Sequence, residues 1–105
     1  MPTKTVSVGT TPMLIHKSTV GYATDFLLQN LSANNLYFGD NSNLTTVNGT
    51  KIVPTGYIAK DGWLGDIWVI ADAASSDVRL VYQAKPLIVY VDETNQIIVR
   101  TRGDP

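Results

Sequence analysis

The segment Asp66–Gln83, which reads DIWVIADAASSDVRLVYQ, constrains the fold more than any other part of the chain. Two runs rich in β-branched and aromatic residues, Ile67–Ala71 and Val78–Tyr82, lie on either side of Ala73–Asp77. The bridging residues are Ala, Ser and Asp, which favour turns, so the segment predicts two strands joined as a β-hairpin with one apolar face. Nothing in this hairpin indicates catalytic chemistry.

Strand-like runs of the same character recur along the chain, each bounded by Gly, Pro, Asn or Asp. We expect these further strand pairs: Thr5–Val8 with Met13–His16, Asp25–Leu31 with Leu36–Phe38, and Leu87–Val91 with Gln96–Thr101. Two more runs are Lys51–Val53 and Tyr57–Lys60. No window of useful length has apolar residues at helical spacing. The chain therefore predicts an all-β fold, a small antiparallel β-sandwich, jelly-roll-like, of about eight to ten short strands with a C-terminal β-hairpin.

The length of 105 residues suits one domain with one hydrophobic core. We expect residues 5–83 to form the core of this single domain, residues 86–101 to add the hairpin, and residues 102–105 to form a flexible tail. The tail contains Arg102-Gly103-Asp104, the motif of integrin-binding loops. Because that motif acts from constrained loop tips, we assign it no role at a chain end.

The composition excludes several classes of partner. Charged residues make up only 16% of the chain and the formal net charge is −1, so no basic surface is available for nucleic acid. We find no apolar run of ~20 residues and no signal peptide. We therefore expect no membrane partner, and we expect the chain to be synthesised in a reducing cytoplasm. Cysteine is absent, which excludes a disulfide framework and a thiolate metal site.

The titratable residues do not form a catalytic pattern. His16 is the only histidine, and it ends an apolar run, which favours a strand-end residue over a catalyst. Glu93 is the only glutamate, and it lies in a predicted turn. Asp61, Asp66 and Asp72 form either a cation site or ordinary turns, and we favour turns because the spacing of a calcium loop is absent. The sequence therefore predicts no catalytic residue, no metal, no cofactor and no enzymatic activity.

Four aromatic residues, Tyr37, Tyr57, Trp63 and Trp68, allow two interpretations. They form either a platform on which a sugar stacks or part of the sandwich core. We favour the core for Trp68, because sandwich cores use large aromatic side chains in the same way.

The C-terminal strands are apolar on both faces. One parity carries Val78, Leu80, Tyr82, Leu87, Val89, Val91, Ile97 and Val99, and the opposite parity carries Arg79, Val81, Ile88, Tyr90, Ile98 and Arg100. An exposed strand face is normally polar, so the second face either packs within the same domain or binds another subunit. We predict a subunit contact, with Ile88, Tyr90, Ile98 and Arg100 as the candidate interface.

Over Thr11–Tyr82, the order of motifs resembles a family of small β-sandwich virion proteins of tailed bacteriophages. The matching residues are Leu28–Leu31, Leu36–Gly39, Asn48-Gly49, Pro54–Gly56, Trp68–Ala71 and Asp77–Leu80. The chain departs from the family pattern by having Thr55 between Pro54 and Gly56, and by the added hairpin Leu87–Thr101. The shared motifs are structural rather than catalytic.

The resemblance implies a structural protein that is made in the host cytoplasm and located in the virion. Our leading expectation is a capsid decoration or cement protein that binds the major capsid protein and stabilises the head. Its partners would be that protein or other virion proteins, and we expect a homo-oligomer or many copies on the particle. The alternative is a tail, baseplate or head-fibre component that contacts the host surface through loops such as Asn41–Asn48.

Overall fold

The computed structural model describes residues 2–91 and 97–101, with side chains from residue 2 to residue 87. Every regular element in these ranges is a β-strand, which confirms the predicted all-β class. The strands are β1 (Thr3–Val8), β2 (Met13–His16), β3 (Tyr22–Asn30), β4 (Leu36–Gly39), β5 (Thr50–Ile52), β6 (Tyr57–Trp63), β7 (Ile67–Ala71), β8 (Ser76–Val91) and β9 (Ile97–Thr101).

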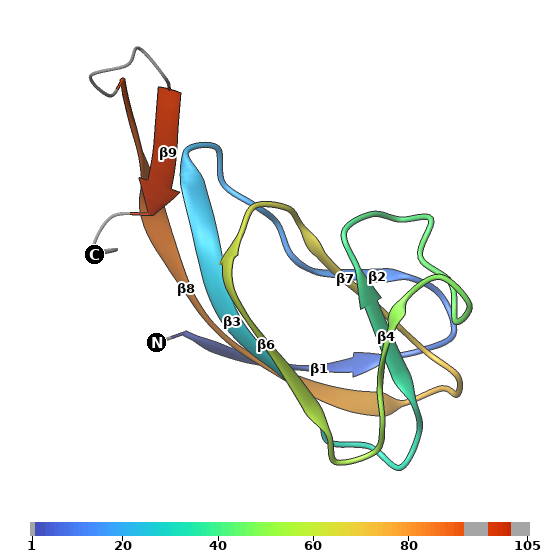
Figure 1. The fold of residues 1–105 in the computed structure, drawn as a ribbon. Coiled ribbons are helices and arrows are strands. Elements are labelled where there is room, and N and C mark those ends of the chain that lie inside the picture. Colours follow the sequence, from blue (N-terminus) through green and yellow to red (C-terminus); the bar gives the residue numbers. More distant parts are fainter. Residues whose placement is uncertain (1, 92–96, 102–105) are drawn as a thin grey trace.

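The strands form two antiparallel sheets that pack face to face, as the predicted sandwich requires (Figure 1). One sheet has the order β1-β8-β3-β6 and the other the order β2-β7-β4-β5, while β9 pairs only with the end of β8. The chain therefore changes sheet at most of its turns, and neighbouring strands are mostly distant in sequence. This is the strand order of a jelly roll.

Three of the predicted hairpins are wrong, because their two strands belong to different sheets. This holds for β1 and β2, for β3 and β4, and for β7 and β8. The β7–β8 connection shows the reason. One core cluster contains Ile67 and Val69 of β7 as well as Val78 and Leu80 of β8. The two pairs of residues approach this cluster from opposite sheets. Their connection crosses the sandwich, and the left-handed conformation of Ser75 (φ 60°) helps to turn the chain there.

The predicted C-terminal hairpin is confirmed at the level of the backbone, where Leu87 pairs with Thr101 and Val91 with Ile97. However, Val78–Tyr82 and Leu87–Val91 are parts of one strand, not two. Pro86 lies inside β8 without breaking it. Tyr82 N donates to Pro2 O, on the side of β1, and Leu87 N donates to Gly21 O, on the side of β3. Since donors alternate along a strand, the N–H that Pro86 lacks would point to the side of β1, beyond its end.

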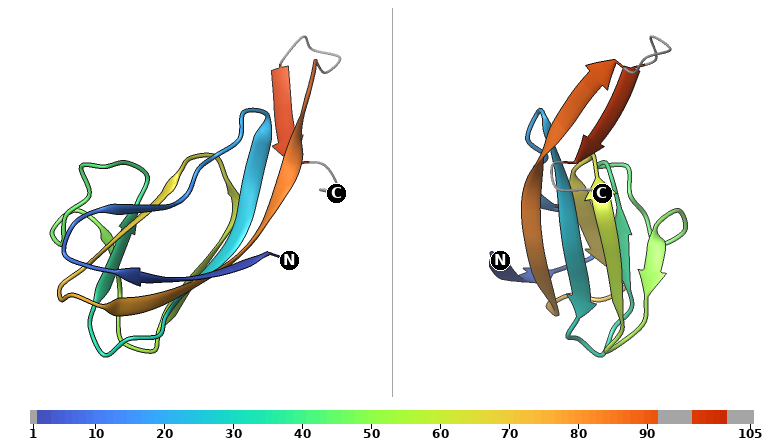
Figure 2. Two further views of the ribbon diagram at one scale, coloured as in Figure 1. Left: turned by 180° about the vertical axis from the view of Figure 1, so that it is seen from behind. Right: turned by 60° about the vertical axis from the view of Figure 1, so that its left-hand side comes forward.

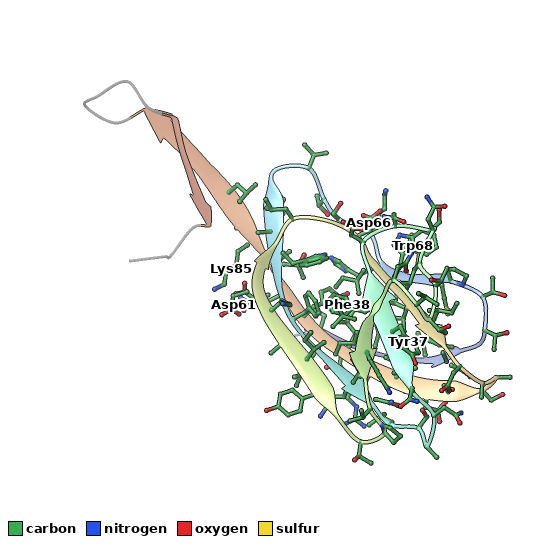
Figure 3. All side chains as sticks on the ribbon, turned by 45° about the vertical axis from the view of Figure 1, so that its right-hand side comes forward. Tyr37, Phe38, Asp61, Asp66, Trp68 and Lys85 are labelled. Atoms are coloured by element: carbon green, nitrogen blue, oxygen red, sulfur yellow. The ribbon has the colours of Figure 1, made fainter. Side chains whose placement is uncertain are left out.

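The core lies between the sheets and is formed by the inner faces of both. Its buried cluster consists of Val8, Ile15, Phe26, Leu28, Leu36, Phe38, Ile52, Ile67, Val69, Ala71, Val78 and Leu80, with Trp63 packed against it. Phe26, Phe38 and Trp63 form mutual ring contacts with centroids 5.7–6.1 Å apart. Figure 3 shows Phe38 on the inner side of β4 and Tyr37 on the opposite side, as strand alternation requires.

Candidate functional site

The C-terminal ribbon, formed by residues 87–91 of β8 and by β9, extends from one end of the sandwich (Figures 1 and 2). Its register pairs Ile88 with Arg100 and Tyr90 with Ile98. Directly paired residues of antiparallel strands share a face, so the backbone brings the four predicted interface residues onto one face of the ribbon. Their side chains lie outside the described part of the structure.

Positions 88 and 90 have the same parity in β8 as Val78, Leu80 and Tyr82, whereas the sequence analysis grouped those three with Leu87, Val89 and Val91. The prediction counted parity separately in two strands, but the pairings of β8 show no register shift between Ser76 and Val91. Side chains alternate along a strand. Positions 88 and 90 therefore have the same parity as the core-facing residues Val78, Leu80 and Tyr82. Every residue of this parity from Val78 to Tyr90 is apolar or aromatic, which defines an apolar row in the sequence of β8, and β8 continues beyond the end of the sandwich in Figure 2.

Where β8 leaves the sandwich, a small cluster of side chains closes the space between the sheets. The His16 ring lies 4.8 Å from the Tyr82 ring between centroids, and His16 Nε2 is 3.2 Å from Thr24 Oγ1. Lys4 Nζ lies 5.4 Å from the centroid of the Tyr82 ring and donates to Ile15 O at 3.2 Å. Burial, and then the charge of Lys4, lower the pKa of His16 below 6.5. His16 is the last residue of β2, as predicted, and it serves there as a neutral packing residue.

An ion pair fixes the outer face of the first sheet near the base of the ribbon. Lys85 Nζ of β8 lies 2.7 Å from Asp25 Oδ2 of β3, and Gly62 N of β6 donates to Asp25 Oδ1 at 2.9 Å. The bond from Lys85, followed by that from Gly62, lowers the pKa of Asp25. One carboxylate therefore joins three neighbouring strands just before β8 extends into the ribbon.

The three aspartates considered for a cation site make separate structural contacts. Asp66 accepts from Ser18 N at 2.7 Å and from Lys17 Nζ at 3.1 Å, and these bonds, that of Ser18 first, lower its pKa to about 2. Asp72 accepts from the main chain and side chain of Asn35. The prediction of a turn at Asp61 is wrong, because β6 continues through it to Trp63. In the described ranges, no three His, Asp or Glu side chains gather into a metal site.

The four aromatic residues are divided among three surroundings, so they do not form one platform. Trp63 packs against the core, and Tyr57 lies 69% exposed on the outer face of the first sheet, beside Gln29. Trp68 is half-buried on the outer face of the second sheet, because its neighbours Ile67 and Val69 fill the core. The prediction of Trp68 as a core residue is therefore wrong.

The outer face of the second sheet has an apolar strip that the sequence analysis missed. Leu14 of β2 pairs with Trp68 of β7 and is 38% exposed. Tyr37 of β4 lies on the same face, where it pairs with Ile70, two residues after Trp68 in β7. The residues around Trp68 are all apolar, which concealed the alternation. The available signal was the alternation in the short run Leu36–Gly39, which places Tyr37 on the face opposite Leu36 and Phe38.

The polar loop 40–49 folds around the buried side chain of Leu44. An added Cβ at Gly49 would lie 2.7 Å from Leu44 Cδ1 and 2.8 Å from Tyr37 Cβ, so glycine is needed there for this packing. Beside Leu44 is a pocket of about 210 Å³, lined by Gly39, Asp40, Asn41, Leu44 and Asn48. The loop thus offers a small polar cavity with an apolar wall.

No helix in the described ranges is long and apolar enough to cross a membrane. Comparisons with protein-family models, with curated proteins and with solved structures found no match to this chain.

Proposed function

We propose that this protein is a structural protein of a tailed-bacteriophage virion, namely a decoration or cement protein that binds the major capsid protein and stabilises the head. The observation that carries the proposal is the continuation of β8 beyond the sandwich into the C-terminal ribbon. An isolated two-stranded ribbon is at best marginally stable in water. A neighbouring protein on the particle would cover the apolar row that the ribbon continues from the core.

Two further features support the proposal. The low content of charged residues, 16%, and the net charge of −1 allow many copies to lie close together without strong mutual repulsion. The order of structural motifs from Thr11 to Tyr82 resembles that of small virion proteins of tailed phages. Neither feature points to catalysis.

The test is the abundance of this chain in purified phage particles that derive from the same genome. We expect a denaturing gel with band densitometry to give a copy number comparable with that of the major capsid protein. Particles from which the protein is deleted should lose head stability to heat, and adding purified protein back should restore it. Absence of the chain from intact particles would contradict the proposal.

The loop pocket favours a second candidate, a tail or baseplate component that contacts the host surface. Asp40, Asn41 and Asn48 line this pocket together with Leu44, a combination of polar and apolar groups that suits a small polar ligand. The same gel separates the two candidates. A tail or baseplate component should be present at a small fraction of the copies of the major capsid protein, and its loss should reduce adsorption rather than head stability.

A further inference from the structure

The four edge strands of the two sheets differ in their protection against pairing with another chain. β2 and β6 each have a register shift that distorts the ladder, and β5 is three residues long and is followed closely by Pro54. Bulges, prolines and short length are the usual means by which edge strands avoid association. β1 has six residues and pairs with β8 without a register shift. Pro2 precedes it, but its carbonyl accepts from Tyr82 N of β8, so this proline does not block the free edge.

The free edge of β1 is defined by Thr3, Thr5 and Ser7. Tyr82 N donates to Pro2 O, so even-numbered residues of β1 direct their main-chain groups toward β8. Direction alternates along the strand, and the N–H and C=O groups of Thr3, Thr5 and Ser7 therefore point away from β8. The edge ends at Gly9, whose carbonyl accepts from Ala71 N of β7 at 2.9 Å.

A lysine on an edge strand usually protects it, but Lys4 is directed elsewhere. Its Nζ donates to Ile15 O and lies over the Tyr82 ring, between the two sheets. The residues that share a face with Thr5 are Thr3 and Ser7, which are exposed and uncharged. The Lys4 ammonium, although the residue is exposed, is therefore directed toward Ile15 and Tyr82 and away from the outer face of this edge.

We propose that β1 pairs with β1 of a second copy of this chain, antiparallel, with a two-fold axis at Thr5. In this register Thr5 lies opposite Thr5 of the second copy, and Thr3 lies opposite its Ser7. Thr3, Thr5 and Ser7 of each copy then each donate one main-chain hydrogen bond to the residue opposite and accept one from it. Within residues 2–9, any other antiparallel register leaves at least one of the three without such a partner, because Gly9 is already bonded to Ala71. The two first sheets become one continuous sheet.

The side chains fit the same register. On the outer face, Thr5 meets Thr5 and Thr3 meets Ser7, and hydroxyl pairs of this kind stabilise neighbouring strands. On the inner face, Lys4 meets Val6 of the second copy, so no like charges are opposed. The contact is isologous, and two-fold dimers are the commonest symmetric assemblies. The inference does not depend on the proposed virion function, since it concerns a different edge from the ribbon.

The first test measures the mass of the pure protein by sedimentation equilibrium up to about 1 mM, a concentration at which weak dimers form. We expect a dimer for the wild type. Thr5→Pro removes only an N–H that points away from β8, so the variant should be a folded monomer. The matched control is Ala59→Pro on β6. Asn30 N donates to Gly56 O, so by alternation the N–H of Ala59 also points away from its neighbour β3, and this variant should remain a dimer.

The second test distinguishes the proposed register and does not depend on proline. Thr5→Lys places two ammonium groups opposite each other at the axis, and Thr5→Glu places two carboxylates there. Each variant alone should be a monomer, and an equimolar mixture should form a mixed dimer that high salt weakens. The proposal is overturned if the wild type stays a monomer at every concentration, which would leave the edge to a different protein. It is equally overturned if the mixture fails to dimerise, or if Thr5→Pro folds and still dimerises.

Discussion

The side chain of Asn30 connects the two sheets, because its Nδ2 donates to Ile52 O of β5 at 3.0 Å although Asn30 itself belongs to β3. The same amide group donates to Asn34 O at 2.7 Å, and Oδ1 accepts from the main chain and the hydroxyl of Ser32. Asn30 is only 1% exposed. One buried amide thus forms hydrogen bonds with main-chain groups of the β3–β4 turn and with β5, an edge strand of the opposite sheet.

Replacing Asn30 with Ala should destabilise the fold by about 3 kcal/mol, because buried carbonyl and amide groups lose their partners and water does not reach them. Urea unfolding followed by circular dichroism measures this change. The control is Asn48→Ala. Asn48 also makes two main-chain bonds, to Thr45 and Asn43, but in an exposed loop where water can replace them. Its loss should cost less than about 1 kcal/mol, and equal effects of the two variants would contradict this account.

Asp66 should make the stability of the protein depend on pH in acid. Its pKa is about 2 in the fold, against 3.8 for the ordinary carboxyl, so the unfolded chain binds the proton more tightly. The carboxylate therefore stabilises the fold above pH 3.8, and this contribution is lost as the pH falls from 3.8 to about 2. Asp66→Asn should flatten the curve of unfolding free energy against pH in that window.

Lys17→Met separates the causes of the Asp66 shift. The main-chain N–H of Ser18 is the largest cause and the Lys17 ammonium is a smaller one. The Lys17 variant should therefore keep most of the acid dependence. If it abolished the dependence as fully as Asp66→Asn does, the ion pair rather than the N–H of Ser18 would be the main contact.

His16 should titrate below 6.5 in an NMR experiment on its ring protons, because the ring is partly buried beside Tyr82 and near the charge of Lys4. Lys4→Met should raise the pKa of His16 but leave it below 6.5, since burial is the larger cause. As the folded pKa lies below the unfolded one, His16 costs stability as the pH falls through 6.5. A pKa above 6.5 in the wild type would contradict this account and would mean that the charge of Asp66, which raises the pKa of His16, outweighs burial.

The sequence predicted the strands of this fold better than their partners. Alternation and turn residues located strands at β2, β4 and β7, because those signals are local. A turn sequence shows that the chain reverses, but it does not show whether the next strand joins the same sheet or the opposite one. Ala73–Asp77 contains turn-forming residues in either case, so the β7–β8 crossing was predicted as a hairpin.

The backbone pairing within the candidate site was predictable for the same reason. Its four residues share one face of a hairpin, which follows from local parity within β8 and β9. The identity of that face depended on whether Pro86 ends a strand. That question is decided by the position of β1, whose pairing ends before Pro86, and not by the sequence around the proline. Trp68 was misplaced because an entirely apolar strand such as β7 shows no alternation.

The ribbon carries the functional prediction. Ile88→Lys together with Ile98→Lys places two charges on one face of the ribbon, at the parity of Val78, Leu80 and Tyr82 in β8. The sandwich should stay folded by circular dichroism, while co-sedimentation with particles that lack the protein should be abolished. Each lost apolar contact would cost roughly 1.5–3 kcal/mol at the interface.

The matched control is Val89→Lys with Val99→Lys, a directly paired couple on the opposite face of the same ribbon. This variant adds the same charge and should still bind particles, since its lysines are directed away from the proposed contact. If only the control loses binding, the opposite face of the ribbon is the interface. If Ile88→Lys with Ile98→Lys unfolds the protein, the ribbon belongs to the monomer's own core, and the particle contact must then lie on the apolar strip of Leu14, Tyr37 and Trp68 or on the loop 40–49.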